Sequence, residues 1–250
     1  MLHSWVLIKK NKMKSSILSI CILSVISSIG SGCNGFDCVD GSGNQISENR
    51  TVEPFTFIET SGSVKLILKQ GPQQLRITAD DNIIKDIRTK VNGGTLSIDM
   101  KGNFCNTGPI TVYLSSQGYE GLEVSGAVDI QSDGILQVKD FELNLSGSSE
   151  VKLNLNAANV RTSSSGASEI FLKGQASTHA VDLSGSSTVE ASDFVVGKYM
   201  IESSGATKSR INVLNELSVK SSGSSDVEYR GNPTKLNNDD SGASSLRKIN

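Results

Sequence analysis

The chain has 250 residues, of which 36% are hydrophobic and 20% are charged, and its formal net charge at pH 7 is −2. It contains no basic cluster, so nucleic acid is excluded as the expected partner, because nucleic-acid binding requires a cationic surface.

Residues 1–32 are predicted to be a lipoprotein signal peptide. Four lysines precede an apolar, serine-rich run over residues 17–29, and Gly-Ser-Gly then leads to Cys33. This order is typical of a secretory signal, and the apolar run is too short to span a bilayer as a mature helix. Cys33 after Gly-Ser-Gly resembles a bacterial lipobox, so we expect it to be lipidated; the alternative is secretion with cleavage nearby and no lipid. Translation starts at Met1 or at Met13, since Met-Lys-Ser-Ser opens a more ordinary leader.

Removal of the leader changes the net charge of the chain, and export sets its expected location. Removal of the four leader lysines changes the net charge from −2 to −6, which argues against electrostatic binding to a membrane surface. We therefore expect an outer-membrane lipoprotein, facing the periplasm or the cell surface, that meets the membrane through its lipid anchor.

Two cysteines remain in the exported part once Cys21 is assigned to the leader and Cys33 to the lipid. In an oxidising compartment, Cys38 and Cys105 are candidates for one disulfide, and the alternative is two unpaired thiols. No metal site or cofactor is predicted, because His179 is the only histidine after the leader and four zinc ligands are not available. We expect His179 to be a packed or corner residue.

The mature chain is predicted to have three parts. Residues 33–50 are polar and glycine-rich, which is typical of a tether. Residues 51–250 are predicted to form one domain, in which residues 51–118 carry longer, less regular strands, with a hairpin at the Asn-Gly-Gly of residues 92–94. Residues 119–250 form a regular array, whose polar last coil is expected to act as a cap.

A Ser-Gly pair followed by Ser or Ala occurs eight times. From the second glycine onward the intervals are 21, 19, 19, 20, 18 and 19 residues, and self-similarity at such a period indicates stacked repeats. The fourth residue after each glycine is apolar in seven of eight cases, and the fourth residue before it in six. The glycines are Gly62, Gly126, Gly147, Gly166, Gly185, Gly205, Gly223 and Gly242.

Each repeat is interpreted as a strand, a Ser-Gly-Ser corner, a second strand and a short return. Apolar residues alternate at period two on both sides of Gly147, which is typical of half-buried strands. A coil of about 19 residues is too short for two strands and a helix, so we predict a parallel β-solenoid with like side chains stacked in columns around a dry interior. An antiparallel sandwich is the second interpretation, and a left-handed helix of hexapeptide repeats is the third.

These features together resemble the head GIN domain family. The exported start, the motif Phe-x-x-Ile-x-x-Ser-Gly-Ser-Val-x-Leu, the sequence Gly-Gly-Thr-Leu-Ser-Ile and the serial corners carry the resemblance over residues 52–246. The family is a domain of unknown function in exported proteins and lipoproteins of Bacteroidetes, with an adhesin label inferred from fold and location. The resemblance implies an all-β, right-handed, single-stranded parallel β-helix and supplies no catalytic residue. The chain departs from the serine pattern at Ala127, Ala167, Ala206 and Ala243.

Several outward acidic residues are candidates for catalysis. Parallel β-helices also host polysaccharide lyases and hydrolases, and such chemistry needs clustered carboxylates or paired acids. The outward acids that could serve are Glu150, Glu169, Glu190, Asp226 and Glu228, although Lys152 and Lys173 could pair with acids across coils. A solvated acidic stripe is the favoured interpretation. No Gly-x-Ser-x-Gly motif accompanies the serines.

The sequence thus predicts a non-enzymatic cell-envelope lipoprotein with an adhesin-like binding or structural role. Its partner would be a glycan or a surface protein, and its oligomeric state is left open. The alternative is a polysaccharide-acting lyase or hydrolase on the same scaffold.

Overall fold

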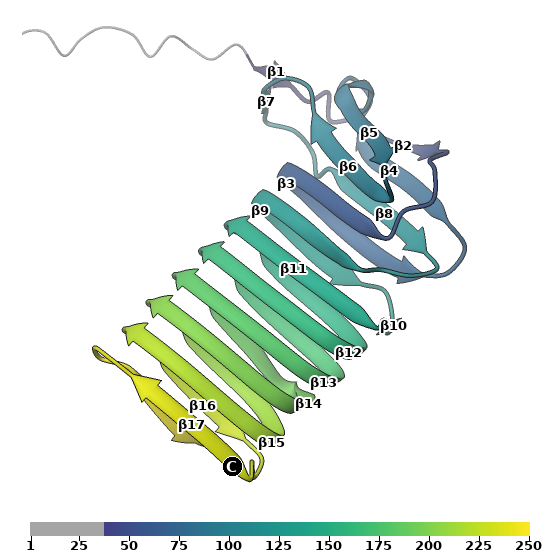
Figure 1. The fold of residues 1–250 in the computed structure, drawn as a ribbon. Helices are drawn as coiled ribbons and strands as arrows, with labels where there is room; N and C mark the ends of the chain where they lie inside the picture. Colours follow the sequence, from purple (N-terminus) through teal and green to yellow (C-terminus); the bar gives the residue numbers. More distant parts are fainter. Residues whose placement is uncertain (1–37) are drawn as a thin grey trace, which may run out of the picture. The chain divides into compact units, whose positions relative to one another are not determined.

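Ser-Gly-Ser corners separate strands that lie on top of one another in the computed structural model, which describes residues 38–250 (Figure 1). These residues form a β-solenoid of about seven coils, each of ~19 residues. The strands are β1 (Val39–Asp40), β2 (Gln45–Arg50), β3 (Phe57–Gln70), β4 (Gln74–Asp80), β5 (Ile87–Asn92), β6 (Thr95–Met100), β7 (Phe104–Cys105), β8 (Thr111–Ser116), β9 (Gly121–Ser132), β10 (Leu136–Gln137), β11 (Asp140–Gly147), β12 (Glu150–Gly166), β13 (Glu169–Gly185), β14 (Thr188–Gly205), β15 (Lys208–Gly223), β16 (Asp226–Arg230), β17 (Lys235–Asp240) and β18 (Ser245–Lys248). One 3₁₀ turn, η1 (Ile84–Asp86), precedes β5.

The pairing from β3 through β9 to β18 is parallel throughout. The sheet order is β18-β16-β15-β14-β13-β12-β11-β9-β3, followed by β8, β4 and β2. The strands β12, β13, β14 and β15 are 16 to 18 residues long, and each runs through both sides of its coil before it reaches the corner glycine. The predicted parallel β-solenoid is therefore confirmed.

The register joins like positions of successive coils, as the repeat predicts. Val151 pairs with Ile170, which pairs with Val189, and the column continues through Ser209 to Val227. All five residues of this column are buried. A second column, four residues before each glycine, contains Ile58, Leu122, Leu143, Thr162, Val181, Ile201 and Val219, and all of these are buried as well. Fully burying one such aliphatic side chain contributes about 1.5–3 kcal/mol.

The corner glycines stack directly on one another. Gly185 has φ +96 and pairs with Gly166 below it and with Gly205 above it. A Cβ atom on Gly185 would lie 2.6 Å from the carbonyl oxygen of Gly166. That same oxygen accepts a hydrogen bond of 2.7 Å from the backbone N–H of Ser186, so the inter-coil ladder continues around the corner. Glycine is required both for the backbone conformation and for the close approach.

Hydroxyl side chains occupy inward positions beside several of the corners, in addition to the apolar columns. The second residue after the glycine is buried in every coil from β12 to β16, as Ser149, Ser168, Ser187, Thr207 and Ser225. Some of these hydroxyls pair within the core: the Oγ atoms of Ser164 and Ser187 lie 2.9 Å apart, and those of Ser203 and Ser221 lie 3.1 Å apart. Repetition of the corner sequence places such groups side by side, where they can hydrogen-bond to one another.

The N-terminal part adds antiparallel strands to the parallel array. The strand β4 lies between β2 and β8 and is antiparallel to both, and β5 forms the predicted hairpin with β6 across Gly93 and Gly94, both of which have positive φ.

The folded unit begins earlier in the chain than the sequence predicts. Residues 33–50 are predicted as a tether, but the compact unit begins at Cys38. β2 pairs with β4 along six residues, so backbone hydrogen bonds hold this polar segment in place. Its side chains are mostly exposed and contribute little apolar packing.

The last coil is polar at inward positions. The strand β17 is exposed along its whole length, and Asn238 occupies a position that is apolar in most other coils. Solvated polar groups at an unpaired edge discourage further strand addition, as expected of a cap.

Two predictions lie outside the described residues: the signal peptide over residues 1–32 and the lipidation of Cys33. Within residues 38–250, no helix is long and apolar enough to cross a membrane.

We expect Gly185→Ala to lower the free energy of unfolding by about 2 kcal/mol or more, because the methyl group meets the Gly166 carbonyl and the positive φ disfavours a side chain. Ser186→Ala, at the next, exposed position, is the matched control and should change stability by less than about 0.5 kcal/mol. Chemical denaturation of both variants measures the difference. Equal stability of the two variants would contradict the glycine stack.

Candidate functional site

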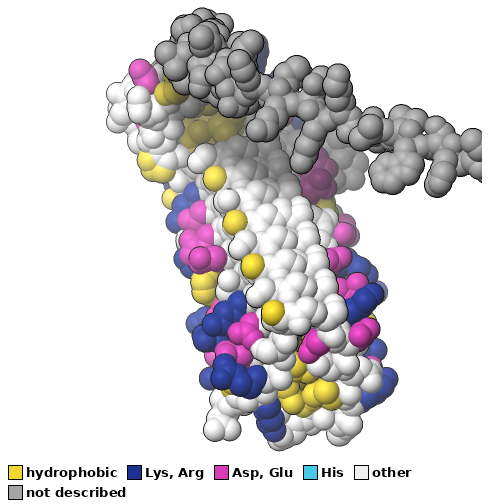
Figure 2. Space-filling model, turned by 90° about the vertical axis from the view of Figure 1, so that its left-hand side faces the viewer, with side chains coloured by type: hydrophobic (Ala, Val, Ile, Leu, Met, Phe, Trp, Pro, Cys, Tyr) yellow, Lys and Arg dark blue, Asp and Glu magenta, His cyan; other side chains and the backbone are white. Residues whose placement is uncertain are grey.

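The corner side of the solenoid forms a long uncharged edge. It consists of each corner glycine and its two neighbours, and we call it the serine edge: residues 61–63, 125–127, 146–148, 165–167, 184–186, 204–206, 222–224 and 241–243. All of these residues are exposed or half-buried. Figure 2 shows this face as a broad uncharged band with charged side chains gathered on both sides.

The acids weighed as catalytic candidates fall into two outward rows. Glu150 pairs in register with Glu169 and with Asp129, and Lys152 forms an ion pair of 2.5 Å with Glu150 of its own strand. This pair raises the pKa of Lys152. Lys173 pairs across coils, with Asp193, at 3.7 Å. Thus Lys173 pairs across coils, but with an acid that is not among the five candidates, whereas Lys152 pairs with a candidate acid of its own coil.

The second row alternates in charge along the axis. Glu190, Arg210, Glu228 and Arg247 occupy consecutive coils at one register position. Arg210 Nε donates to Glu228 Oε2 at 2.7 Å, and Arg247 also binds this carboxylate. The side chain of Glu228 is only 7% exposed. Hydrogen bonds from Arg210 and then Arg247 hold the pKa of Glu228 below its ordinary value.

The environment of Glu228 does not suit a general acid. Hydrogen bonds lower the pKa of Glu228, as they do for Glu216 and Asp81, whereas a general acid requires a raised pKa. Asp226, another of the candidate acids, is hydrogen-bonded by Ser245 of the next coil.

His179 lies in the core and is fully buried, as the sequence predicts for a packed histidine. Its Nε2 atom lies 2.9 Å from Thr162 Oγ1, and its Nδ1 atom lies 3.0 Å from Tyr199 Oη. Burial lowers the pKa of His179 to about 3, so the ring is neutral. Because Thr162, His179 and Tyr199 satisfy one another inside the solenoid, they cannot reach a substrate.

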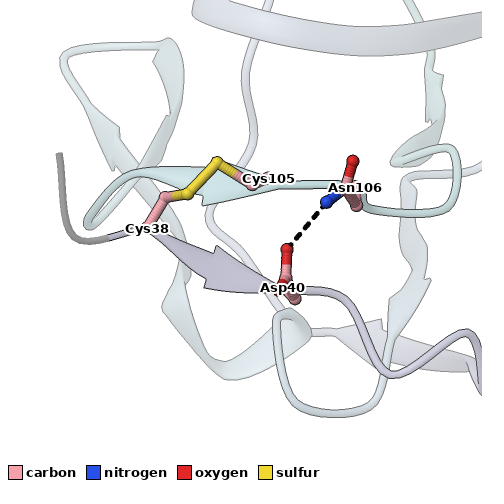
Figure 3. The surroundings of a disulfide bond; sticks show 4 residues. All are labelled: Cys38, Asp40, Cys105 and Asn106. Atoms are coloured by element: carbon pink, nitrogen blue, oxygen red, sulfur yellow. Dashed lines mark hydrogen bonds between the residues drawn. A yellow bond between two sulfur atoms is a disulfide. The ribbon is translucent and has the colours of Figure 1, made fainter. Parts of the chain in front are cut away.

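The structure brings Cys38 and Cys105 together in a disulfide whose Cα atoms are 5.7 Å apart (Figure 3). Cys38 directly precedes β1, and Cys105 is the last residue of β7, which pairs in parallel with β1. Asn106 Nδ2 donates to Asp40 Oδ1 at 3.0 Å. This disulfide fastens the start of the folded unit to the segment that follows β6.

A groove of 970 Å³ opens on the outer surface where the N-terminal part meets the regular array. Its lining comes from the start of β3, the segment before β9, the segment between β10 and β11, and the outward positions of β11 to β14. The lining includes one half-buried aromatic ring, Phe57, and the charged residues Glu120, Lys139, Glu142 and Arg161.

Sequence reasoning did not identify this groove. The interval from Gly126 to Gly147 is 21 residues, whereas every later interval is 18 to 20, but this difference does not mark the groove. Gln131 pairs with Lys152 and Leu136 with Leu155, which places the two additional residues between Gln131 and Leu136, outside the lining.

No group of three or more His, Cys, Asp or Glu side chains in residues 38–250 is arranged to hold a metal ion.

Comparisons with known proteins agree with the solenoid. The family described as "Putative auto-transporter adhesin, head GIN domain" matches residues 54–233. A search of curated proteins finds no match.

Three solved structures share the fold, and the chain covers 100% of each. A putative adhesin from Bacteroides fragilis is 20% identical, over 84% of this chain, with a TM-score of 0.79. A putative adhesin from Parabacteroides distasonis is 19% identical over 85%, with a TM-score of 0.68. A protein described as a putative lipid binding protein from the same organism is 18% identical over 86%, with a TM-score of 0.62.

Glu228 should stabilise the fold in a pH-dependent manner. Because its folded-state pKa is depressed, its contribution is present above its ordinary pKa of 4.5 and is lost as the pH falls through the folded value. Glu228→Gln should therefore be less stable than the wild type at about pH 7, and the difference should shrink as the pH falls below 4.5 and through the folded-state pKa. Denaturation at about pH 7 and over a series of acidic pH values tests this, with Glu202→Gln at an exposed position as control. A difference that does not depend on pH would refute the ion-pair account.

Replacement of Cys38 and Cys105 by Ser should lower the free energy of unfolding by about 2–4 kcal/mol, because the disulfide closes a loop with a sequence separation of 67 residues. Cys21→Ser is the control and should leave stability unchanged. Denaturation with and without reductant provides the measurement, and a wild-type chain insensitive to reductant would argue against the bond.

Proposed function

The chain belongs to the head GIN domain family of putative auto-transporter adhesins, and on that premise we propose that it is an exported, non-enzymatic lipoprotein of the outer membrane that acts in adhesion. The observation that carries the proposal is the division of the outer surface. Several of the charged groups form ion pairs within or between coils, whereas the serine edge is left exposed over the length of the array. Such a surface suits contact with a large partner through many weak polar interactions.

Export and lipidation rest on the sequence of residues 1–33. If Cys33 carries the lipid, the chain between Cys33 and Cys38 spans at most about 18 Å. The folded unit would then stand close to the membrane, with the disulfide fixing its first residue to the N-terminal part of the solenoid. The structures named as adhesins support this proposal through their shared fold.

The test compares cells that carry the wild-type chain, Cys33→Ser or Cys21→Ser. We expect the wild type and Cys21→Ser to incorporate labelled fatty acid, to remain in the membrane fraction and to increase adherence to mucin-coated or matrix-coated surfaces. Cys33→Ser should lose all three properties. Equal adherence of wild-type cells and of cells lacking the chain would contradict an adhesive role, and labelling of Cys33→Ser would contradict the lipid assignment.

A further inference from the structure

One side chain, Gln70, joins the two segments that line the groove of 970 Å³. Gln70, at the end of β3, donates through Nε2 to the carbonyl oxygens of Gln117 at 2.8 Å and of Gln137 at 3.1 Å. Its Oε1 accepts from the backbone N–H of Gln137 at 2.7 Å. Gln70 therefore connects the segments that provide the two walls of the groove, residues 118–120 and residues 137–140.

The second wall is also fixed to the coil above it. Val138 N donates to Asn156 O at 2.9 Å, and the Lys139 carbonyl accepts from the N–H groups of Ala158 and Asn159, both at 2.9 Å. Because both walls are hydrogen-bonded to the solenoid, the groove is preformed, and a ligand would not have to order these segments on binding.

The floor of the groove carries an aromatic ring over a glycine. Phe57 pairs in register with Gly121, and a Cβ atom on Gly121 would lie 2.7 Å from Cε2 of the Phe57 ring. The ring thus occupies the space of the missing side chain and leans across the sheet, and it remains half-buried. Along the same register row Gly121 is followed by Glu142 and Arg161 and then by the apolar pair Ala180 and Met200, so two charged residues separate Phe57 from this pair.

Hydrogen-bond acceptors and donors both line the groove. Glu120 Oε2 accepts from Thr56 at 2.9 Å, and Glu142 Oε1 accepts from Asn144 at 3.0 Å. A carboxylate offers about four lone-pair sites, so each can accept further hydrogen bonds. Arg161 lies next to Glu142 in register and supplies donors.

A second polar row continues along the axis. Asn159 Nδ2 donates to Asp140 Oδ1 at 2.6 Å, and Thr178 Oγ1 donates to Asn159 Oδ1 at 2.7 Å. These three residues occupy successive coils at one register position and orient one another.

The charges of the lining nearly cancel, since Glu120, Asp140 and Glu142 oppose Lys139 and Arg161. Such a site does not favour a strongly charged ligand. It combines an apolar ring with closely placed donors and acceptors, and this combination fits a molecule that has apolar C–H faces and many uncharged hydroxyl groups.

We propose that this groove binds a neutral oligosaccharide. One sugar ring packs on Phe57, and the hydroxyl groups of the oligosaccharide are hydrogen-bonded by Glu142, Arg161 and the row from Asp140 to Thr178. The proposal rests on the adhesive function proposed above and specifies the chemical class of its ligand. The groove runs over several coils, so successive sugar units would meet successive coils.

The test titrates the full chain, purified in a detergent without a sugar headgroup, with cellohexaose, mannohexaose and chitohexaose by calorimetry. Hexagalacturonate serves as the acidic comparison. We expect at least one neutral hexasaccharide to bind and the acidic one to bind at least about tenfold more weakly. Binding of none of the three neutral sugars, or tighter binding of the acidic one, would overturn the proposal.

Variants locate the site. Phe57→Ala and Arg161→Ala should each weaken binding about tenfold. Phe171→Ala, which removes a half-buried outward ring of β13 outside the groove, is the matched control and should leave the affinity unchanged. Because a folding defect could also reduce binding, thermal unfolding of each variant is compared, and Phe57→Tyr should retain binding by keeping the ring.

Adhesion assays separate this proposal from the broader one. If cells with Phe57→Ala and Arg161→Ala adhere as strongly as wild-type cells and the purified variants bind sugar normally, the groove assignment fails while the adhesive function stands. If the variants lose sugar binding although the wild-type chain promotes no adherence, the groove assignment stands and the adhesive function fails.

Discussion

The solenoid depends on the close approach of one corner glycine to the next. Each corner must turn the chain without a side chain, and the backbone of Gly166 lies where a Cβ of Gly185 would be. In return the hydrogen-bond ladder is not interrupted at the corner, because the residue after each glycine donates to the glycine carbonyl of the preceding coil. This contact sets a common register for all coils, and every column of inward side chains follows from it.

The same register explains how polar residues are tolerated inside. Neighbours in a column are separated by one coil, about 4.8 Å. A lone histidine in an apolar column would be costly to bury, but His179 has Thr162 and Tyr199 within hydrogen-bond distance on either side. On the outside, the register produces the alternating row from Glu190 to Arg247. Outward side chains therefore form rows along the axis, and in the groove Gly121 interrupts one such row beside Phe57.

Periodicity made much of this architecture predictable. The columns through Val151 and Leu143, the corner glycines, the hairpin after Val91 and the polar last coil all follow from residue spacing alone. The strand β2 was not predicted, because its residues are polar and it is held by backbone pairing with β4. The groove was not predicted either, since it brings Phe57 onto Gly121 and places Gln70 between two walls, contacts between residues far apart in the sequence. The buried hydroxyls were missed because a serine after Ser-Gly-Ser looks the same in sequence whether it points in or out.

Distances along the serine edge test the stacking of the coils most directly. Ser148 and Ser224 are exposed and four coils apart, and Ser63 and Ser224 are six coils apart. Spin labels on cysteines introduced at these positions, measured by double electron–electron resonance against the unsubstituted chain, should give separations of about 19 Å and about 29 Å. Separations that do not increase in proportion to the number of coils would show that the coils are not stacked along one axis.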